Sequence, residues 1–90
     1  MATLQNIRQR IIHRDYYLSS HAEEEMLDDD LERKDLENAI LQGHIEKKMI
    51  HDSRGTRYRI EGPALDGRII HIICRFGEGA RFIIITVYAL

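Results

Sequence analysis

The stretch from Arg68 to Leu90 constrains the fold most, because it holds two apolar runs joined by a glycine-rich tetrapeptide. The runs Ile69 to Phe76 and Phe82 to Tyr88 are rich in β-branched and aromatic residues, as strands are. The joining residues 77–80, Gly-Glu-Gly-Ala, tolerate the positive φ angles of tight connections. The sequence therefore predicts a β-hairpin whose two strands lie centrally in a sheet.

The first half of the chain shows helical rather than alternating spacing. Apolar residues recur at helical spacing from Leu4 onward, and this predicts a helix over Thr3 to His13. After a short extended piece, Ser20 and Glu23 match a capping box, which predicts a second helix over His21 to Asp29. A third helix is predicted over 33–42, with Gly43 as its C′ residue.

The pattern changes to alternation after the third helix. One strand is predicted from His44 onward and another over Thr56 to Glu61, with a turn at 52–55, Asp-Ser-Arg-Gly, between them. Helices that precede a run of antiparallel strands predict a single α+β domain over residues 1–90. We expect the N-terminal helices to pack on one face of a four-stranded, or slightly larger, antiparallel sheet.

Bulk properties exclude several classes of protein. A net charge of −2 means that any nucleic-acid binding requires positive charge segregated onto one surface. The single Cys74 builds no intramolecular disulfide, which fits a reducing compartment. The opening MATLQNIRQR does not resemble a signal peptide, and the longest apolar stretch, Phe82 to Val87, is too short for a membrane span. We expect a cytoplasmic protein without a membrane partner.

Strand alternation predicts which side chains face the core and which lie on the open face of the sheet. The predicted core set in the hairpin is Ile70, Ile72, Cys74, Phe76, Ile83, Ile85 and Val87. The predicted open-face set is Arg57, Arg59, Glu61, Ile69, His71, Ile73, Arg75, Phe82, Ile84, Thr86 and Tyr88, joined by Lys48 or Lys47. The open face is thus more basic than the chain average, whereas most acidic residues fall between Glu23 and Glu37 on the helices.

The polar residues of this face suit phosphate chemistry. Arginine binds phosphate oxygens bidentately and stabilises a charged transition state. Histidine or tyrosine can move a proton at a 2′-hydroxyl or a leaving oxygen. The alternative is that these side chains form a solvated face or a partner interface, since strand positions facing solvent are polar by default.

Two other candidates carry less weight. His21 has helical spacing to Glu24 and Glu25, but no second histidine pairs with it at helical spacing, so we expect no metal and no cofactor. Cys74 lies in an apolar strand where nothing lowers its pKa, so we do not expect a nucleophile there.

Several segments, taken in order, resemble a bacterial family of domains of unknown function. They are LSSHAEEEML at the second helix, DLENAILQGHIE at the third helix and its exit, RYRIEG in mid-chain and IIITVY at the end. The family features are an S-x-HA-x-x-x-M helix start, a D-[VLI]-x-x-A-[IL]-x-x-G segment and a terminal T-V-Y strand. Its marked residues correspond to His21, Gly43, Thr86 and Tyr88.

That family is distantly similar to small toxins of type II toxin–antitoxin systems, the RelE, MqsR and BrnT group. The resemblance implies a helix-backed antiparallel sheet and a metal-independent endoribonuclease that acts on mRNA. It also implies a cognate antitoxin as partner, which in the MqsR-like case carries a zinc-finger domain. Catalytic residues of these toxins are basic and aromatic side chains on the sheet.

We therefore expect catalysis from Arg75, with His71, His21 or Tyr88 as the proton carrier. RNA binding is expected from Arg57, Arg59, Lys48 and Thr86. The rival hypothesis is a non-catalytic interaction module, which pairs its open face with a partner protein or with a second copy as a homodimer. Apolar open-face residues, predicted as Ile69, Ile73, Phe82 and Ile84, motivate this rival.

Overall fold

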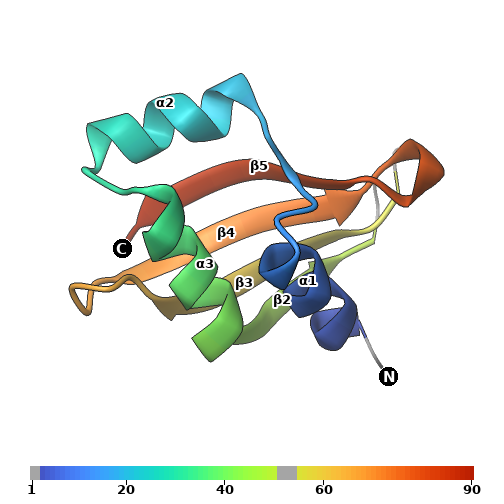
Figure 1. Ribbon diagram of the computed structural model, residues 1–90, viewed down its shortest axis with the longest axis horizontal. Helices are drawn as coiled ribbons and strands as arrows, with labels where there is room; N and C mark the ends of the chain where they lie inside the picture. The colour runs from blue at the N-terminus through green and yellow to red at the C-terminus, as the bar shows by residue number, and fades with distance from the viewer. Residues whose placement is uncertain (1–2, 51–54) are drawn as a thin grey trace.

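The computed structural model describes residues 3–50 and 55–90 and contains three helices and a five-stranded sheet (Figure 1). The elements are α1 Thr3–Ile12, β1 Tyr17–Leu18, α2 Ser20–Asp28, α3 Arg33–Gln42, β2 His44–Met49, β3 Arg57–Pro63, β4 Ile69–Phe76, a 3₁₀ turn Glu78–Ala80 and β5 Phe82–Ala89. The strand order is β1-β5-β4-β3-β2, with β1 parallel to β5 and the other neighbours antiparallel. The α+β prediction is confirmed. Of the predicted turn at 52–55, only Gly55 lies within the described residues.

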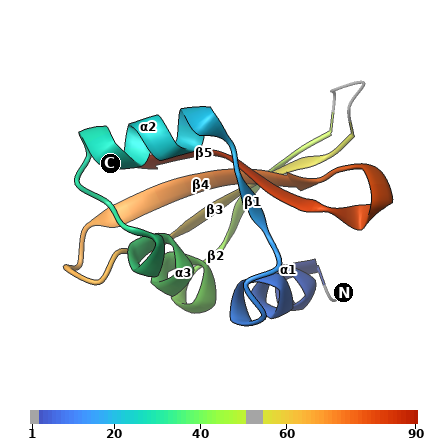
Figure 2. The same cartoon turned by 45° about the horizontal axis from the view of Figure 1, so that its top comes forward.

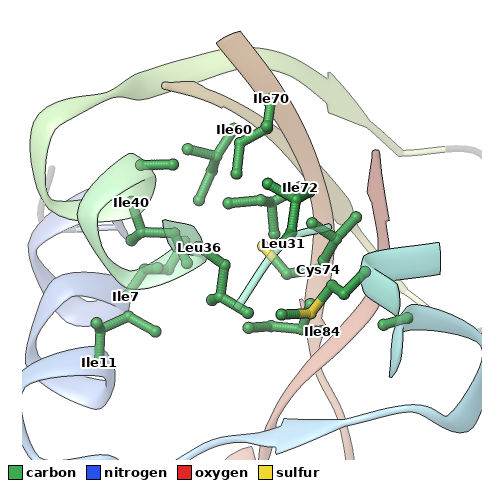
Figure 3. Close-up of a cluster of buried hydrophobic side chains, with 14 of the residues drawn as sticks. Ile7, Ile11, Leu31, Leu36, Ile40, Ile60, Ile70, Ile72, Cys74 and Ile84 are labelled. Atoms are coloured by element: carbon green, nitrogen blue, oxygen red, sulfur yellow. The ribbon is translucent and has the colours of Figure 1, made fainter. Parts of the chain in front are cut away.

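All three helices contribute to one core on one face of the sheet. Figures 1 and 2 show α1 and α3 against the strands and α2 running beside β5. Figure 3 shows Ile7 of α1 and Leu36 of α3 meeting Ile60, Ile72 and Ile84 of the sheet. Because every helix packs on this face, the predicted open face is confirmed as the one without helices.

The alternation predicted for β4 is correct, but that for β5 is wrong in its first half. Phe82 and Ile84 were expected on the open face and are fully buried in the core. The cause is a β-bulge, because Ile73 pairs with Thr86 whereas Cys74 pairs with Ile84, which leaves Ile85 as the extra residue. A bulge shifts the side-chain alternation by one residue, so only the second half of β5 keeps the predicted parity.

A second bulge lies in β2. Ile45 pairs with Ile60 of the core, and Lys47 pairs with Arg59 of the open face, so Glu46 is the extra residue. Lys48 pairs with Tyr58, whose side chain packs against the core. Of the two lysines proposed for the open face, Lys47 therefore lies there, and Lys48 lies on the helix-bearing side.

The start of α2 is tied to the sheet by Ser19, not by the predicted cap Ser20. The Ser19 hydroxyl accepts a hydrogen bond from the Ala22 amide at 3.0 Å and donates to the Ile85 carbonyl at 2.8 Å. One side chain thus caps the helix and donates a hydrogen bond to the carbonyl of the bulged residue of β5. This double role explains why the cap falls one residue earlier than predicted.

Further along, α2 covers the edge of β5 with two carboxylates. Glu25 accepts a hydrogen bond from the Val87 amide, and Asp29 accepts one from the Ala89 amide, each at 3.0 Å. Glu25 and Asp29 are four residues apart, so they lie one above the other on the same helix face. They satisfy edge amides that would otherwise be open to another strand.

Helix α3 lies unusually close to β3, and two glycines permit this approach. A Cβ built on Gly62 would overlap the backbone of Ala39, and one on Gly43 would overlap both Ala39 and the Glu61 carbonyl. Gly43 has φ −95°, so its requirement for glycine comes from space and not from a left-handed backbone. Ala39 itself is fully buried.

Candidate functional site

A row of three polar side chains crosses the open face on adjacent strands. Glu61 of β3 pairs with His71 of β4, and His71 pairs with Tyr88 of β5. The His71 Nε2 atom lies 2.9 Å from Glu61 Oε1, and Nδ1 lies 3.1 Å from the Tyr88 hydroxyl. His71 is only 8% exposed, because its neighbours cover the ring on both sides. The imidazole is therefore fixed, whereas Glu61 and Tyr88 on either side of it are half-buried.

The hydrogen-bond partners of His71 determine where its protons lie. An ionised Glu61 can only accept, so Nε2 carries the proton towards it. In the neutral ring Nδ1 is then an acceptor, and the Tyr88 hydroxyl donates to it. Protonation of Nδ1 would reverse this bond and make the tyrosine oxygen an acceptor. The row can thus move a proton between a surface phenol and an imidazole backed by a carboxylate.

Arg59 of β3 adds a cation beside this row. Its Nε donates to Glu46 Oε1 at 2.6 Å. This hydrogen bond raises the pKa of Arg59, and the Tyr88 hydroxyl adds a smaller contribution to the same shift. The same bond lowers the pKa of Glu46, and His71 and Lys47 lower this pKa further. Glu46, Arg59, Glu61, His71 and Tyr88 therefore form one electrostatic unit, the sheet-face cluster.

The remaining predicted residues lie at different distances from this cluster. Thr86 is in the next row of the open face, opposite Ile73, which in turn pairs with Arg59. Arg57 and Arg75 lie further along the same face, where Arg57 pairs with Met49 and Arg75 with Ile83.

His21 is not part of the sheet-face cluster. It lies on α2, with Nε2 3.5 Å from Glu25 Oε1. The same carboxylate accepts the hydrogen bond from the Val87 amide. The structure therefore brings His71, Tyr88 and Arg59 together and places Lys48 and His21 elsewhere.

Two members of the cluster had no predicted site role. Glu61 was expected on the open face, but its contact with His71 requires the register between β3 and β4. Glu46 reaches Arg59 from the bulge in β2, which simple alternation does not predict. A carboxylate at the same strand face as a histidine is the signal that would have identified Glu61.

Other chemistry-bearing groups are accounted for by packing. Burial raises the pKa of the Cys74 thiol to about 12. Within residues 3–50 and 55–90, no group of three or more histidine, cysteine, aspartate or glutamate side chains is arranged to hold a metal ion. In the same residues no helix is long and apolar enough to cross a membrane.

The fold and the site define an α+β domain whose open, mostly antiparallel sheet carries a glutamate–histidine–tyrosine row. A family model described as Domain of unknown function (DUF4258) matches residues 18–89. The chain belongs to this family, as the order of its motifs predicted. Comparison with curated proteins and with solved structures gave no match.

Proposed function

We propose that the protein is a metal-independent endoribonuclease of the toxin class that cleaves mRNA on the open sheet face. The observation that carries the proposal is the Glu61–His71–Tyr88 row with Arg59 beside the phenol. Acid–base groups and a cation are the components that phosphodiester transfer within RNA needs. The cytoplasm, where mRNA is found, would be the place of action.

In the proposed reaction the 2′-oxygen of RNA forms a bond to phosphorus as the bond to the 5′-oxygen breaks. Tyr88 takes the proton of the 2′-hydroxyl while its own proton passes to Nδ1 of His71, and Glu61 stabilises the resulting imidazolium. Water protonates the leaving 5′-oxygen, and the hydroxide that remains takes the extra proton back from the row, which restores neutral His71. The products are a 2′,3′-cyclic phosphate and a 5′-hydroxyl.

Arginines of the face hold the substrate in this proposal. Glu46 binds Nε of Arg59, which leaves the terminal nitrogens of the guanidinium for the phosphate oxygens. Arg57 and Arg75 contact the flanking phosphates. Thr86 lies between these two arginines and the Glu61–His71–Tyr88 row. Lys47, which pairs with Arg59, takes the role that was expected of Lys48. A cognate antitoxin would inhibit the protein by covering the same face.

The variant Tyr88→Phe tests the proposal with one oxygen removed. We expect RNA cleavage to fall by about a hundredfold, because general acid–base catalysis contributes on that order. The assay measures loss of labelled RNA at low salt in the presence of EDTA and identifies the cyclic phosphate. Tyr17→Phe is the matched control, since Tyr17 is an exposed tyrosine on β1. RNA that survives excess wild-type protein, or full activity in Tyr88→Phe, would refute the proposal.

A non-catalytic interaction module is the second candidate, favoured by apolar residues among the charges of the open face. Ile69 is 42% exposed, and Ile73 and Ile83 are half-buried. Exposed apolar patches on a sheet commonly mark a protein interface. Phe82 and Ile84, which were predicted to belong to this apolar set, lie in the core.

Light scattering across a concentration series tests this second candidate. We expect wild type to approach the mass of a dimer and Ile69→Glu to remain monomeric, since a charge within the contact opposes its burial. Leu65→Glu, at an exposed leucine of the β3–β4 connection, is the control and should dimerise like wild type. A monomer at every concentration would rule out the homodimer.

A further inference from the structure

An apolar groove lies between α2 and the beginning of α3, away from the sheet-face cluster. Its volume is about 330 Å³, and its apolar lining comes from Leu18, Met26, Leu27 and Leu31. A second hollow of about 390 Å³ shares Met26, Leu27 and Leu31, so the apolar surface continues around Leu27. Met26 and Leu31 are buried and form the floor, whereas Leu27 stands on the rim.

Leu27 is not explained by the packing of the domain. It is 79% exposed, the largest value among the large hydrophobic residues in the described part of the chain. Helix α2 already contacts the core through Ala22 and Met26 on its other side. An exposed leucine beside an apolar groove is the arrangement expected where a partner supplies the missing cover.

The charges around the groove define the chemistry of that partner. Glu23 lies one helical turn before Leu27, and Asp30 and Glu32 lie in the connection between α2 and α3, all three exposed. Glu32 is also 3.7 Å from the ammonium of Lys34. Arg33 also lines the groove and keeps its positive charge, with its guanidinium 5.5 Å from the centroid of the Tyr16 ring. Because three carboxylates stand against this one guanidinium, the rim carries a net negative charge around an apolar centre.

We propose that this groove is a docking surface for a basic amphipathic helix of another protein. Its apolar stripe would cover Leu27 and Leu31, and its flanking lysines or arginines would pair with Glu23, Asp30 and Glu32. Helices that dock in grooves place apolar anchors at the spacing of one turn, and charges at the rim set the orientation. This surface is separate from the sheet-face cluster, so the inference does not depend on the proposed function.

Binding of a synthetic helical peptide with a leucine stripe flanked by lysines tests the proposal. The full chain is titrated against the fluorescent peptide at low salt, and anisotropy is measured. We expect Leu27→Asp to raise the Kd of the peptide by about tenfold or more, a difference that the titration resolves easily. Leu27→Asp is informative because it adds negative charge: attraction by charge alone would make the lysine peptide bind more tightly.

Controls separate the groove from general acidity. Leu65→Asp adds the same charge at another exposed leucine and should leave peptide affinity unchanged or slightly higher. Glu23→Lys should weaken binding, and a peptide with glutamates in place of lysines should not bind. Equal or tighter binding by Leu27→Asp, or no binding by wild type, would overturn the proposal. Self-association that Leu27→Asp abolishes in light scattering would also overturn it, because the occupant would then be a second copy of the chain.

Discussion

Gly62→Ala lowers the melting temperature by about 15 °C, because overpacking costs up to about 3 kcal/mol and each kcal/mol shifts a domain of this size by about 4–8 °C. The added Cβ would lie 2.8 Å from the Ala39 carbonyl carbon, and this neighbour is backbone of α3, which cannot rotate away. Relief requires α3 to move off the sheet, which would open the core around Leu36 and Ile40. Thermal unfolding followed by circular dichroism measures the change.

Gly67→Ala is the matched control for Gly62→Ala. Gly67 has φ +91°, and a Cβ there meets no atom within 4 Å. This substitution therefore costs only the backbone strain of a left-handed residue, about 1 kcal/mol. Equal losses in the two variants would contradict the close approach of α3 to β3 as the reason for glycine at position 62.

The Cys74 thiol reacts with iodoacetamide at pH 8 at least about a thousandfold more slowly in the folded protein than in guanidinium chloride, since only the thiolate reacts. Burial raises its pKa from 9.0 to about 12, and the side chain is fully inaccessible. Alkylation then requires opening of the domain, so its rate reports unfolding. Mass spectrometry of timed samples gives the rate.

The same pKa shift fixes the sign of a pH effect. Because the folded thiol holds its proton more tightly than the unfolded thiol, the stabilisation is complete below pH 9 and is lost as pH rises from 9 towards 12.

The variant Cys74→Ser, Gln9→Cys serves as the control for the alkylation rate. Gln9 is exposed, so a cysteine at this position should react as in the unfolded chain. Rapid alkylation of native Cys74 would show that the strand is not enclosed.

The fold class follows from the sequence because local pattern and global packing agree over most of the chain. The alternation in β4 places Ile72 inward and His71 outward, as the structure has them. The alternating pattern and the turn residues suffice there, because in a regular strand the polarity of each side chain indicates the face on which it lies. The alternation predicted for β5 holds at Thr86, Val87 and Tyr88 and fails between Phe82 and Ile84, on the other side of the bulge.

The types of residue in the site could be predicted from the sequence, but the contacts that bring them together could not. His71, Tyr88 and Arg59 were assigned to one face from alternation, and they do contribute to one cluster. The contact of Arg59 with Glu46 depends on the bulge in β2, which no local signal encodes. His21 was included from its motif, yet its contact is with Glu25, and Ser19 of the same motif binds β5.

The carboxylate cover on β5 has a consequence for protein synthesis. Glu25 and Asp29 bond to amides 62 and 60 residues later in the chain. When α2 leaves the ribosome, the strand it must cover has not yet been translated, so Met26 has no sheet to pack against. Contacts of such long sequence separation form late and slow the folding of a domain. The contacts of α2 with β5 can therefore form only after residues 82–89 have emerged.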